Sequence, residues 1–302
     1  MRIYVEILIR GDMDELWQKT QDPKLHERWD LRFSQIDYLP RKPGEPQKFL
    51  YSTRIGAGLR ISGEGESTGE HDDDVSGRRT SALKFWSTDA KSLIEVGSGY
   101  WQYTPNESGI RFLTSYDYRT RFGAIGKIID RLAFRPLIGW ATAWSFDRLR
   151  LWIEQGVAPE VSRDLALIYT LSRLTLAFVW IYHGVVPKLL YHNPDELRML
   201  SDAGVPHTQL LNWVSLFGWL EVGFALILIA FWRARWPLWC TIVAMFAATL
   251  GVSISSPAYL TGAFDPLTLN LAVAVLAGTG LLVSKNLPTA KSCYRSPPET
   301  RR

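Results

Sequence analysis

Cysteine is scarce in this chain of 302 residues, which contains only Cys240 and Cys293. Two isolated cysteines provide neither a disulfide framework nor a paired redox motif, so thiol exchange within the chain is not expected. No GxGxxG, P-loop or nucleophile-elbow signature is present, which argues against the enzyme classes that those motifs mark. The formal net charge of +4 forms no extended basic patch, so nucleic acid is not an expected partner.

A signal peptide and a metal site are also missing from the sequence pattern. Glu6, Asp12 and Asp14 interrupt every early apolar run, so we expect the domain that follows to stay in the cytoplasm. The acidic cluster His71–Asp74 consists of consecutive residues, whose side chains point to opposite sides of an extended chain and cannot all face one ion. We interpret this cluster as a solvated turn.

Long apolar runs fill the second half of the chain, although the mean hydropathy of −0.04 is that of a soluble protein. Residues 1–155 contain 23 Lys+Arg and 22 Asp+Glu, whereas residues 156–302 contain 11 and 8. Four apolar runs are each about long enough to cross a bilayer core of roughly 30 Å. They are Leu165–Tyr182, Leu210–Trp232, Trp236–Ile254 and Pro266–Val283. We therefore predict a four-span membrane domain.

Basic residues lie unequally around these runs. They precede the first run, form Arg233–Arg235 between the second and third, and recur from Lys285 onward, whereas the alternate loops contain only Arg198. By the positive-inside rule, both termini are expected in the cytoplasm, with the protein in the inner (plasma) membrane. The stretch Arg119–Arg150 carries seven basic residues against two acidic ones, and either contacts anionic headgroups or presents solvated helix charge.

The first half has the pattern of an antiparallel sheet followed by a long helix. Strand-like runs separated by Gly and Asp clusters are 2–10, 33–39, 48–55, 59–66, 79–87, 92–104 and 110–120. After residue 120 the apolar period becomes helical. Leu137, Trp140 and Trp144 fall on one face of this helix, and Pro136 is expected to kink or divide it.

This half resembles the START-like superfamily of polyketide cyclases, aromatase-cyclases and lipid-transfer domains. The resemblance rests on Trp17, Trp29, the strand Gly99–Tyr103, the strand end Asp117–Tyr118 and the closing helix through Trp144 to Trp152. It implies an α+β helix-grip fold, in which an antiparallel sheet wraps around a long C-terminal helix and encloses an elongated apolar cavity. Such cavities usually hold a lipid, polyketide or other hydrophobic molecule, and many members of the superfamily bind without catalysing.

Aromatic side chains are concentrated on the strands that would enclose this cavity. By the period of two, Phe112, Tyr116 and Tyr118 share one face of the last strand. Such residues either line a pocket or fill a core without a void, and both interpretations stay open. The expected cavity residues are Trp86, Trp101, Tyr103, Phe112, Tyr116, Tyr118, Trp140 and Trp144.

The second half resembles the DoxX-like family of four-span membrane proteins, over about Leu165–Lys285. The matching residues are Arg173, Trp180–Gly184, Pro187–Lys188, Glu196, Gly218, Glu221, Gly262–Pro266 and Asn270. Better-known relatives of that family are linked to thiosulfate:quinone oxidoreduction or to thiol redox complexes, and most members have no assigned activity. The resemblance therefore implies a fold more directly than a reaction.

Polar residues within the apolar runs are the expected intramembrane sites, because charge is costly in hydrocarbon. They are Arg173, His183, Lys188, Glu221, Asp265 and Asn270. Arg173 and Glu221 lie about 12 Å and about 16 Å from the cytoplasmic ends of their spans, so the two could pair, as a structural clamp or as a proton or ligand site. The other four would form a group near the outer face, where His183 could bind a quinone head. Interhelical hydrogen bonding is the simpler explanation, and Lys188 could extend towards the interface.

These patterns predict a START-like cytoplasmic domain (1–155), a linker (156–164), an all-α four-helix DoxX-like transmembrane bundle (165–285) and a basic, disordered cytoplasmic tail (286–302). The leading hypothesis is a multi-pass membrane protein that binds a hydrophobic small molecule or lipid in its first domain, without catalytic residues, metal or cofactor. One alternative is a subunit of a quinone-linked membrane oxidoreductase, with quinone as cofactor. Another is cyclase or hydrolase activity in the START-like domain. Self-association or a partner membrane subunit is expected for so small a bundle.

Overall fold

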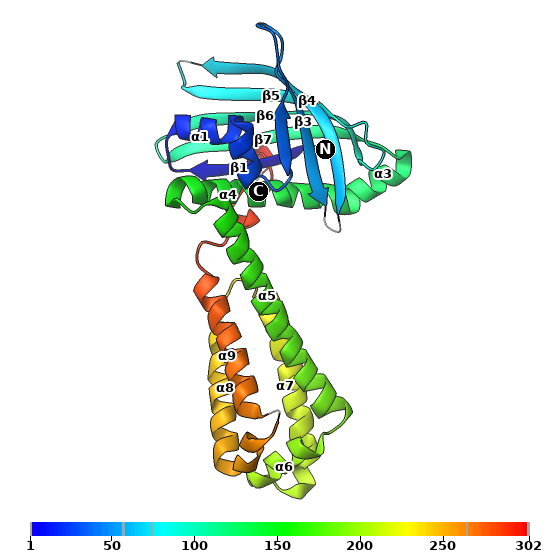
Figure 1. Ribbon diagram of the computed structural model, residues 1–302, viewed down its shortest axis with the longest axis vertical. Helices are drawn as coiled ribbons and strands as arrows, with labels where there is room; N and C mark the ends of the chain where they lie inside the picture. Colours follow the sequence, from blue (N-terminus) through cyan, green and yellow to red (C-terminus); the bar gives the residue numbers. More distant parts are fainter. Residues whose placement is uncertain (1, 56–57, 74, 264, 301–302) are drawn as a thin grey trace. The chain divides into compact units, whose positions relative to one another are not determined.

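The structure, a computed structural model, describes residues 2–55, 58–73, 75–263 and 265–300. The chain divides into two compact units (Figure 1). The first consists of Met1–Ser162 together with Pro288–Arg302, and the second is Arg163–Leu287. Two residues of the motifs discussed above, Asp74 and Phe264, lie outside the described residues.

The first unit contains a seven-stranded antiparallel sheet with the order β1-β7-β6-β5-β4-β3-β2. Its strands are β1 (Ile3–Ile9), β2 (Gln35–Tyr38), β3 (Lys48–Ile55), β4 (Leu59–Asp73), β5 (Arg78–Trp86), β6 (Ile94–Asn106) and β7 (Gly109–Thr120). Each lies within a few residues of a predicted strand except β4, which is longer. Because a bulge between Ser67 and Gly69 accommodates Thr68 as one extra residue, the ladder continues through His71–Asp73, where we predicted a turn.

The helices of this unit are α1 (Met13–Gln21), α2 (Pro23–Trp29), α3 (Gly123–Ile129), the π turn η1 (Asp130–Phe134) and α4 (Arg135–Gln155). Asp12 caps α1 and Asp22 caps α2, because each carboxylate accepts two backbone N–H groups of the first helical turn. The elements α3, η1 and α4 follow one another without an intervening loop. Pro136 has no N–H to donate within the helix, and we predicted that the helix would kink or divide at this residue. The structure has the π turn η1 just before Pro136.

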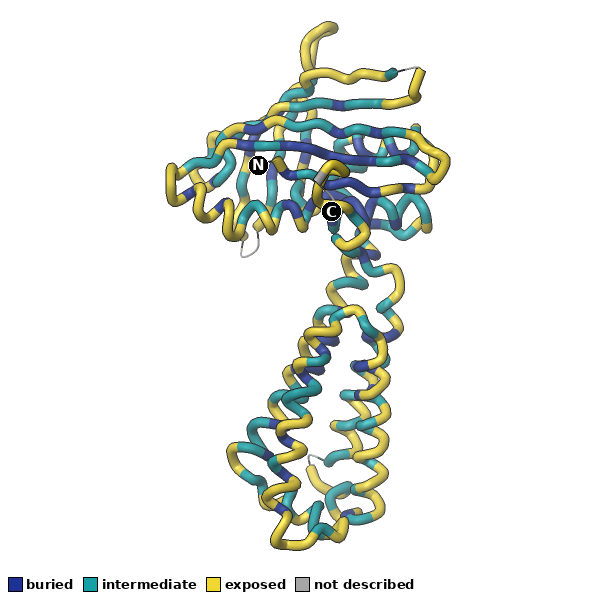
Figure 2. The backbone as a smooth tube through the Cα atoms, turned by 180° about the vertical axis from the view of Figure 1, so that it is seen from behind, coloured by how far each residue is buried: buried dark blue, intermediate teal, exposed yellow. Residues whose placement is uncertain are grey.

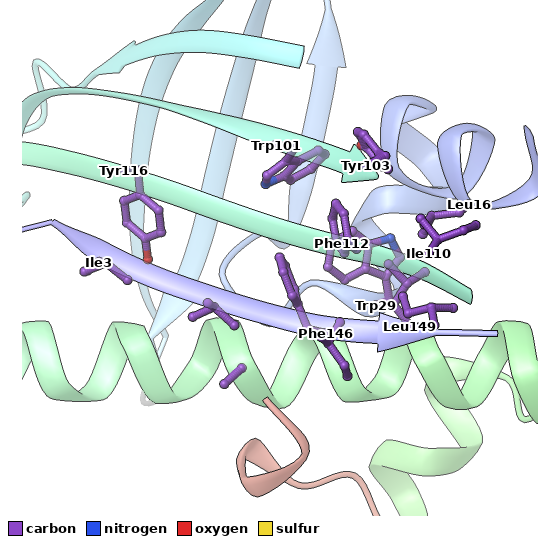
Figure 3. Close-up of a cluster of buried hydrophobic side chains, with 14 of the residues drawn as sticks. Ile3, Leu16, Trp29, Trp101, Tyr103, Ile110, Phe112, Tyr116, Phe146 and Leu149 are labelled. Atoms are coloured by element: carbon purple, nitrogen blue, oxygen red, sulfur yellow. The ribbon is translucent and has the colours of Figure 1, made fainter. Parts of the chain in front are cut away.

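The core of the first unit lies between the sheet and α4 (Figure 3). Phe112 of β7 stacks on Tyr103 of β6 and on Phe146 of α4, with ring centroids 4.9 Å and 4.4 Å apart. Trp29 is fully buried beside them and donates its indole N–H to the carbonyl of Lys19. Burial of each large apolar side chain stabilises the fold by about 1.5–3 kcal/mol, so this aromatic stack is the main energetic link between sheet and helix.

Glycines on the inner face of the sheet lie beneath aromatic rings from neighbouring strands. A Cβ atom at Gly97 would lie 2.4 Å from Phe85, and one at Gly65 would lie 2.3 Å from Phe49. Only a residue without a side chain lets these rings lie flat against the strand. The rings therefore fill space that larger residues would otherwise occupy.

The C-terminal segment packs on the first unit, in contrast to the disordered tail predicted for 286–302. Tyr294 and Glu6 of β1 exchange backbone hydrogen bonds of 2.9 Å in each direction. Thr289 donates its N–H to the buried carboxylate of Asp147, and the thiol of Cys293 donates to the carbonyl of Ala143. The short helices η5 (Ala290–Ser292) and η6 (Pro298–Thr300) belong to this segment. The basic composition of residues 286–302 gave no indication of these hydrogen bonds.

The second unit is helical and contains the four predicted spans. Its elements are α5 (Pro159–His183, which begins within the first unit), the π helix η2 (Gly184–Leu190), α6 (Pro194–Asp202), η3 (His207–Gln209), α7 (Leu210–Ala230), α8 (Trp236–Ser255), η4 (Pro257–Thr261) and α9 (Pro266–Val283). Four helical segments of the described residues are long and apolar enough to cross a membrane. Because α5 begins at Pro159, most of the expected linker 156–164 is helical.

Few of the residues on the spans are buried inside the unit (Figure 2), as expected for helices that face lipid. A compact cluster that includes Tyr169, Leu176, Leu228 and Leu281 joins the helices. Gly184 and Gly218 allow the closest approach, since a Cβ atom at Gly218 would lie 2.9 Å from the carbonyl oxygen of Gly184. Small residues at this crossing bring η2 against α7.

Candidate functional site

Five of the predicted cavity residues lie together in the core of the first unit. They are Trp101, Tyr103, Phe112, Tyr116 and Tyr118, each at most 8% exposed. Their rings contact one another and α4, as in the edge-to-face pair of Trp101 and Phe112 at 5.9 Å. At this end of the interior the aromatic residues form a packed core, which was one of the two interpretations left open by the sequence.

The other three predicted cavity residues lie elsewhere. Trp140 is 42% exposed and stacks on Trp144, which is half-buried, and neither belongs to the buried cluster. The face of α4 that meets the sheet carries Phe146 and Leu149 instead, so the helical face was wrongly assigned. Trp86 follows Phe85 on β5 and by strand alternation points to the opposite side of the sheet from that core-facing ring.

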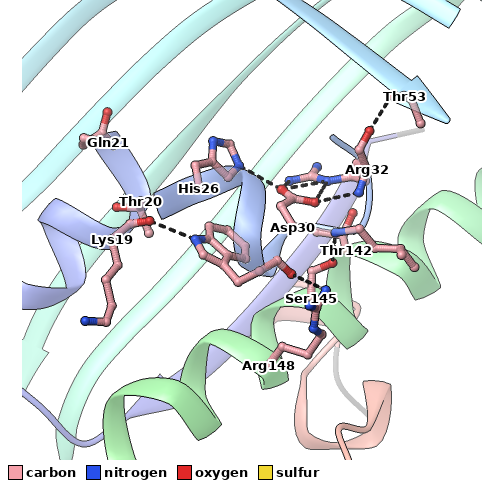
Figure 4. Close-up of polar contacts among 12 residues, drawn as sticks. Lys19, Thr20, Gln21, His26, Asp30, Arg32, Thr53, Thr142, Ser145 and Arg148 are labelled. Carbon is pink, nitrogen blue, oxygen red and sulfur yellow. Dashed lines mark hydrogen bonds and ion pairs between the residues drawn. The ribbon is translucent and has the colours of Figure 1, made fainter. Parts of the chain in front are cut away.

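A polar network that the sequence did not reveal is buried beside this core (Figure 4). Asp30, directly after α2, accepts a hydrogen bond of 3.0 Å from the His26 ring in the tautomer that carries the proton on Nε2, and it binds the guanidinium of Arg32 at 2.6 Å. The His26 ring stacks on Trp29 and meets the edge of Trp101. The only sequence signal for this network was the opposite charge of residues 30 and 32, two positions apart.

The electrostatics of this network favour a charged Asp30. Burial alone would raise the pKa of Asp30, but the charge of Arg32 and the hydrogen bonds from His26 and Arg32 outweigh burial. The pKa of the carboxyl group therefore lies well below its usual value. Each group of the network is already bonded to another, which is the arrangement of a structural ion pair rather than of a free acid or base.

Arg173 in α5 is fully buried and binds backbone, not Glu221. Its guanidinium donates to the carbonyl oxygens of Leu228 at 2.6 Å, Phe231 at 3.0 Å and Ala234. These carbonyls lie at and just beyond the C-terminal end of α7, where helices leave acceptors without intrahelical partners. The predicted pair of Arg173 and Glu221 was wrong, because the arginine caps the end of a helix instead.

Glu221 pairs with Lys188, which the π helix η2 presents to α7. Pro187 lies inside η2 and cannot donate an N–H, so the helix widens there and the buried ammonium of Lys188 approaches Glu221. The Lys188 nitrogen lies 3.2 Å from Oε1 of Glu221 and 2.9 Å from Glu196 of α6. One cation thus holds two carboxylates from different helices, and Glu196 completes the group.

The remaining predicted intramembrane residues do not join this group. Asp265 caps α9 by accepting the N–H of Thr268, and Asn270 donates to Thr249 of α8, which is an interhelical hydrogen bond of the kind expected. His183 lies on the exposed side of α5, with its ring 6.2 Å from that of Tyr182. The described residues contain no cluster of three metal-ligating side chains.

An open groove of about 500 Å³ lies beside Glu221 in the second unit. Its lining is almost entirely apolar and aromatic, comprising Trp180, Phe217, Trp219, Leu220, Glu221, Gly223, Phe224 and Ile227. Trp180 meets Phe224 edge to face at 4.9 Å. Among the described residues, two buried polar atoms of this lining have no hydrogen-bond partner, namely the indole Nε1 of Trp180 and Oε2 of Glu221. A second open groove, of about 550 Å³, lies over β2, β3 and β4 near Asp37 and Arg60.

The groove at Trp180 and Glu221 has the composition of a small-molecule site. Ligand sites are mostly apolar and contain a few polar groups that fix orientation. Here one unused donor and one unused acceptor lie in an apolar lining, and a buried polar atom without a partner is costly. A ligand that carries both a hydrogen-bond acceptor and a donor would satisfy both atoms.

Comparisons with known proteins identify the membrane-spanning half most clearly. The model of the DoxX-like family matches residues 177–278, which include Trp180, Lys188 and Glu221. The uncharacterized membrane protein YndG of Bacillus subtilis (strain 168) is 52% identical over 183 residues, which cover 60% of this chain and 68% of that protein. The chain is a membrane protein with a DoxX-like domain.

Two solved structures with some similarity in fold each cover about half of this chain. Hypothetical protein jhp0584 from Helicobacter pylori has a TM-score of 0.41 at 16% identity, with 51% of this chain and 88% of that chain covered. A STAR-related lipid transfer protein from Xanthomonas axonopodis has a TM-score of 0.38 at 13% identity, with 51% and 86% covered. The predicted helix-grip fold is confirmed by the antiparallel strand order and the long helix of this chain itself.

Proposed function

We propose that the DoxX-like unit of this chain, which belongs to the family of the Bacillus subtilis membrane protein YndG, binds a hydrophobic small molecule from the bilayer. In this proposal the protein acts by binding, not by catalysis. The observation that carries this proposal is the groove at Trp180 and Glu221, with its two unpartnered buried atoms. Glu221 remains anchored by Lys188 through its other oxygen, so the carboxylate is fixed in direction while its buried Oε2 has no hydrogen-bond partner.

The START-like unit offers weaker support for ligand binding. Most of the aromatic residues expected to line a cavity are stacked into a core around Phe112, and neither of the two grooves described above lies between the sheet and α4. The titratable groups His26, Asp30 and Arg32 are bonded to one another. We therefore assign no cyclase or hydrolase reaction to this unit, and the ligand proposal moves from the sheet to the membrane-spanning helices.

A second candidate function, a subunit of a quinone-linked oxidoreductase, is favoured by the same two atoms. A quinone carbonyl could accept from the indole N–H of Trp180, and a hydroquinone hydroxyl could donate to Oε2 of Glu221. The apolar groove would receive the remainder of the molecule. His183 is not among the lining residues, so the quinone contact predicted for it has no support in this geometry. This function requires a partner subunit that supplies electrons.

The proposed orientation places both termini in the cytoplasm and the protein in the plasma membrane. The basic residues around the spans support it. Residues 1–162 and 288–302 also form one unit, as an even number of spans requires. Labelling of Leu50→Cys and Tyr191→Cys in intact cells with an impermeant maleimide tests the orientation. Only Tyr191→Cys should react, and reaction of Leu50→Cys would contradict the proposed orientation.

Native mass spectrometry of the full-length protein in nanodiscs tests the binding site. We expect a small bound molecule to be retained by the wild type and lost from Trp180→Phe and Glu221→Gln, because each removes one of the two polar contacts. The matched control is Trp213→Phe, which lies on α7 with Glu221 but outside the groove and should retain the molecule. Lys188 keeps Glu196 as a partner in Glu221→Gln, so the fold should survive.

The identity of the bound mass separates the two functions. A quinone, together with quinone-dependent turnover that Glu221→Gln abolishes, would favour the oxidoreductase subunit. A lipid or another apolar molecule without turnover would favour binding alone. A bound mass that persists unchanged in both groove variants would contradict the proposed site.

A further inference from the structure

The helix formed by α3, η1 and the start of α4 exposes an unusual number of large apolar side chains. Between residues 122 and 140 they are Phe122, Ile125, Ile128, Ile129, Leu132, Leu137 and Trp140. Leu132 is 75% exposed and Ile125 is 68% exposed, which is the reverse of what a soluble helix shows. Apolar surface gathered on one segment, unlike single scattered residues, marks an interaction site.

These side chains form one continuous stripe because of the π turn. Ile125, Ile129 and Leu132 follow at spacings of four and three, as on one face of an α-helix. The next members, Leu137 and Trp140, follow after spacings of five and three. The single extra residue that a π turn contains thus keeps the stripe in register across η1, where an uninterrupted α-helix would have shifted it sideways.

The charges beside the stripe are positive. Lys127 and Arg131 are exposed, whereas the acidic residue of the segment, Asp130, is buried and bonded to Tyr118 and Arg135. The exposed surface between residues 122 and 140 therefore contains basic and apolar side chains but no carboxylate. That composition fits a helix lying in the headgroup region of an anionic membrane, with its apolar face in the acyl boundary.

We infer that the α3–η1 face of the START-like unit, with the first turns of α4, docks onto the surface of the bilayer that the same chain spans. The chain enters its first span directly after this unit and returns to the unit directly after its fourth, so a bilayer is always within reach. A partner protein would need to supply a matching apolar and acidic surface, whereas an anionic leaflet supplies both properties. The docking is independent of the groove at Glu221.

Site-directed spin labelling of the full-length protein in nanodiscs containing phosphatidylcholine and phosphatidylglycerol tests this docking. The background carries Cys240→Ser and Cys293→Ser, and labels are attached at Leu132→Cys and Ile128→Cys. Leu50→Cys, on an exposed strand face, is the aqueous control, and Leu282→Cys, in the fourth span, is the lipid control. We expect labels at residues 128 and 132 to collide more with oxygen than with a water-soluble nickel chelate, as at residue 282.

Two outcomes would overturn the inference. A label at residue 132 that is as accessible to the nickel chelate as the label at residue 50 would show that the stripe is in water. A label accessible to neither reagent would show that protein, such as a second copy of the chain, covers it. Replacing Lys127 and Arg131 with glutamine should reduce the oxygen preference in anionic nanodiscs and leave it unchanged in purely zwitterionic ones. An equal effect in both would remove the electrostatic part of the inference.

Discussion

Replacing Arg173 with leucine should destabilise the membrane-spanning unit through the end of α7. Three carbonyl oxygens, of Leu228, Phe231 and Ala234, would lose the donor that the buried guanidinium supplies. Interhelical hydrogen bonds in membranes contribute about 0.6 kcal/mol on average, and an unsatisfied buried group costs about 1–3 kcal/mol. For three bonds the expected loss in the free energy of unfolding is therefore roughly 2–9 kcal/mol.

The assay is reversible unfolding in mixed detergent micelles, followed by circular dichroism. Arg173→Lys should recover only part of the loss, because one ammonium group cannot span carbonyls that a planar guanidinium reaches with two nitrogens. The control is Arg235→Leu, an exposed arginine just before α8, which should change the stability by less than about 0.5 kcal/mol.

A double-mutant cycle tests whether Arg173 and Glu221 interact, as the sequence predicted. The changes Arg173→Leu and Glu221→Gln should add to within about 0.5 kcal/mol, since the two side chains share no partner. The changes Lys188→Met and Glu221→Gln should instead show a coupling of about 0.5–3 kcal/mol. A coupling above about 1 kcal/mol between Arg173 and Glu221 would refute the assignment of Arg173 as a helix cap.

Three further outcomes follow from the structure. The depressed pKa of Asp30 stabilises the fold above the unfolded value of about 3.9 and loses this contribution as pH falls towards the folded value. Asp30→Asn should therefore lower stability at pH 7 and flatten its loss below about pH 4, as followed by tryptophan fluorescence; an unchanged acid profile would contradict the network. Gly218→Leu should destabilise the bundle by at least about 1–3 kcal/mol through overpacking against Gly184 and Leu189, and wild-type stability would refute that crossing. Burial raises the pKa of Cys293, so its alkylation at pH 8 should be slow in the folded protein and rapid after unfolding; fast alkylation of the folded protein would show that the tail is detached.

The sequence predicted those elements whose pattern depends on one periodicity. The strands followed from alternation and the spans from apolar length, because each signal lies within the element itself. The face of α4 did not follow. This helix has apolar residues both towards the sheet, at Phe146 and Leu149, and away from it, at Leu137 and Trp140, and the helical period alone cannot tell which stripe is covered.

The partners of the intramembrane charges depended on features that residue counting omits. Depth alone placed Arg173 and Glu221 at similar levels, but the carbonyls after α7 offer Arg173 closer acceptors. The widened turn at Pro187 moves Lys188 onto Glu221, and a count of about 1.5 Å per residue contains no such turn. Glu196 belonged to the site although it lies outside the apolar runs.

The pairing of Tyr294 with Glu6 has a consequence for how the protein can be shortened. Strand β1 is one border of the sheet, and an uncovered border exposes amide and carbonyl groups that recruit strands from other molecules. The last residues of the chain occupy part of that border. A fragment that stops before the first span would have the complete sheet but a bare flank, and we expect it to associate into multimers that a separately added peptide of residues 288–300 would disperse.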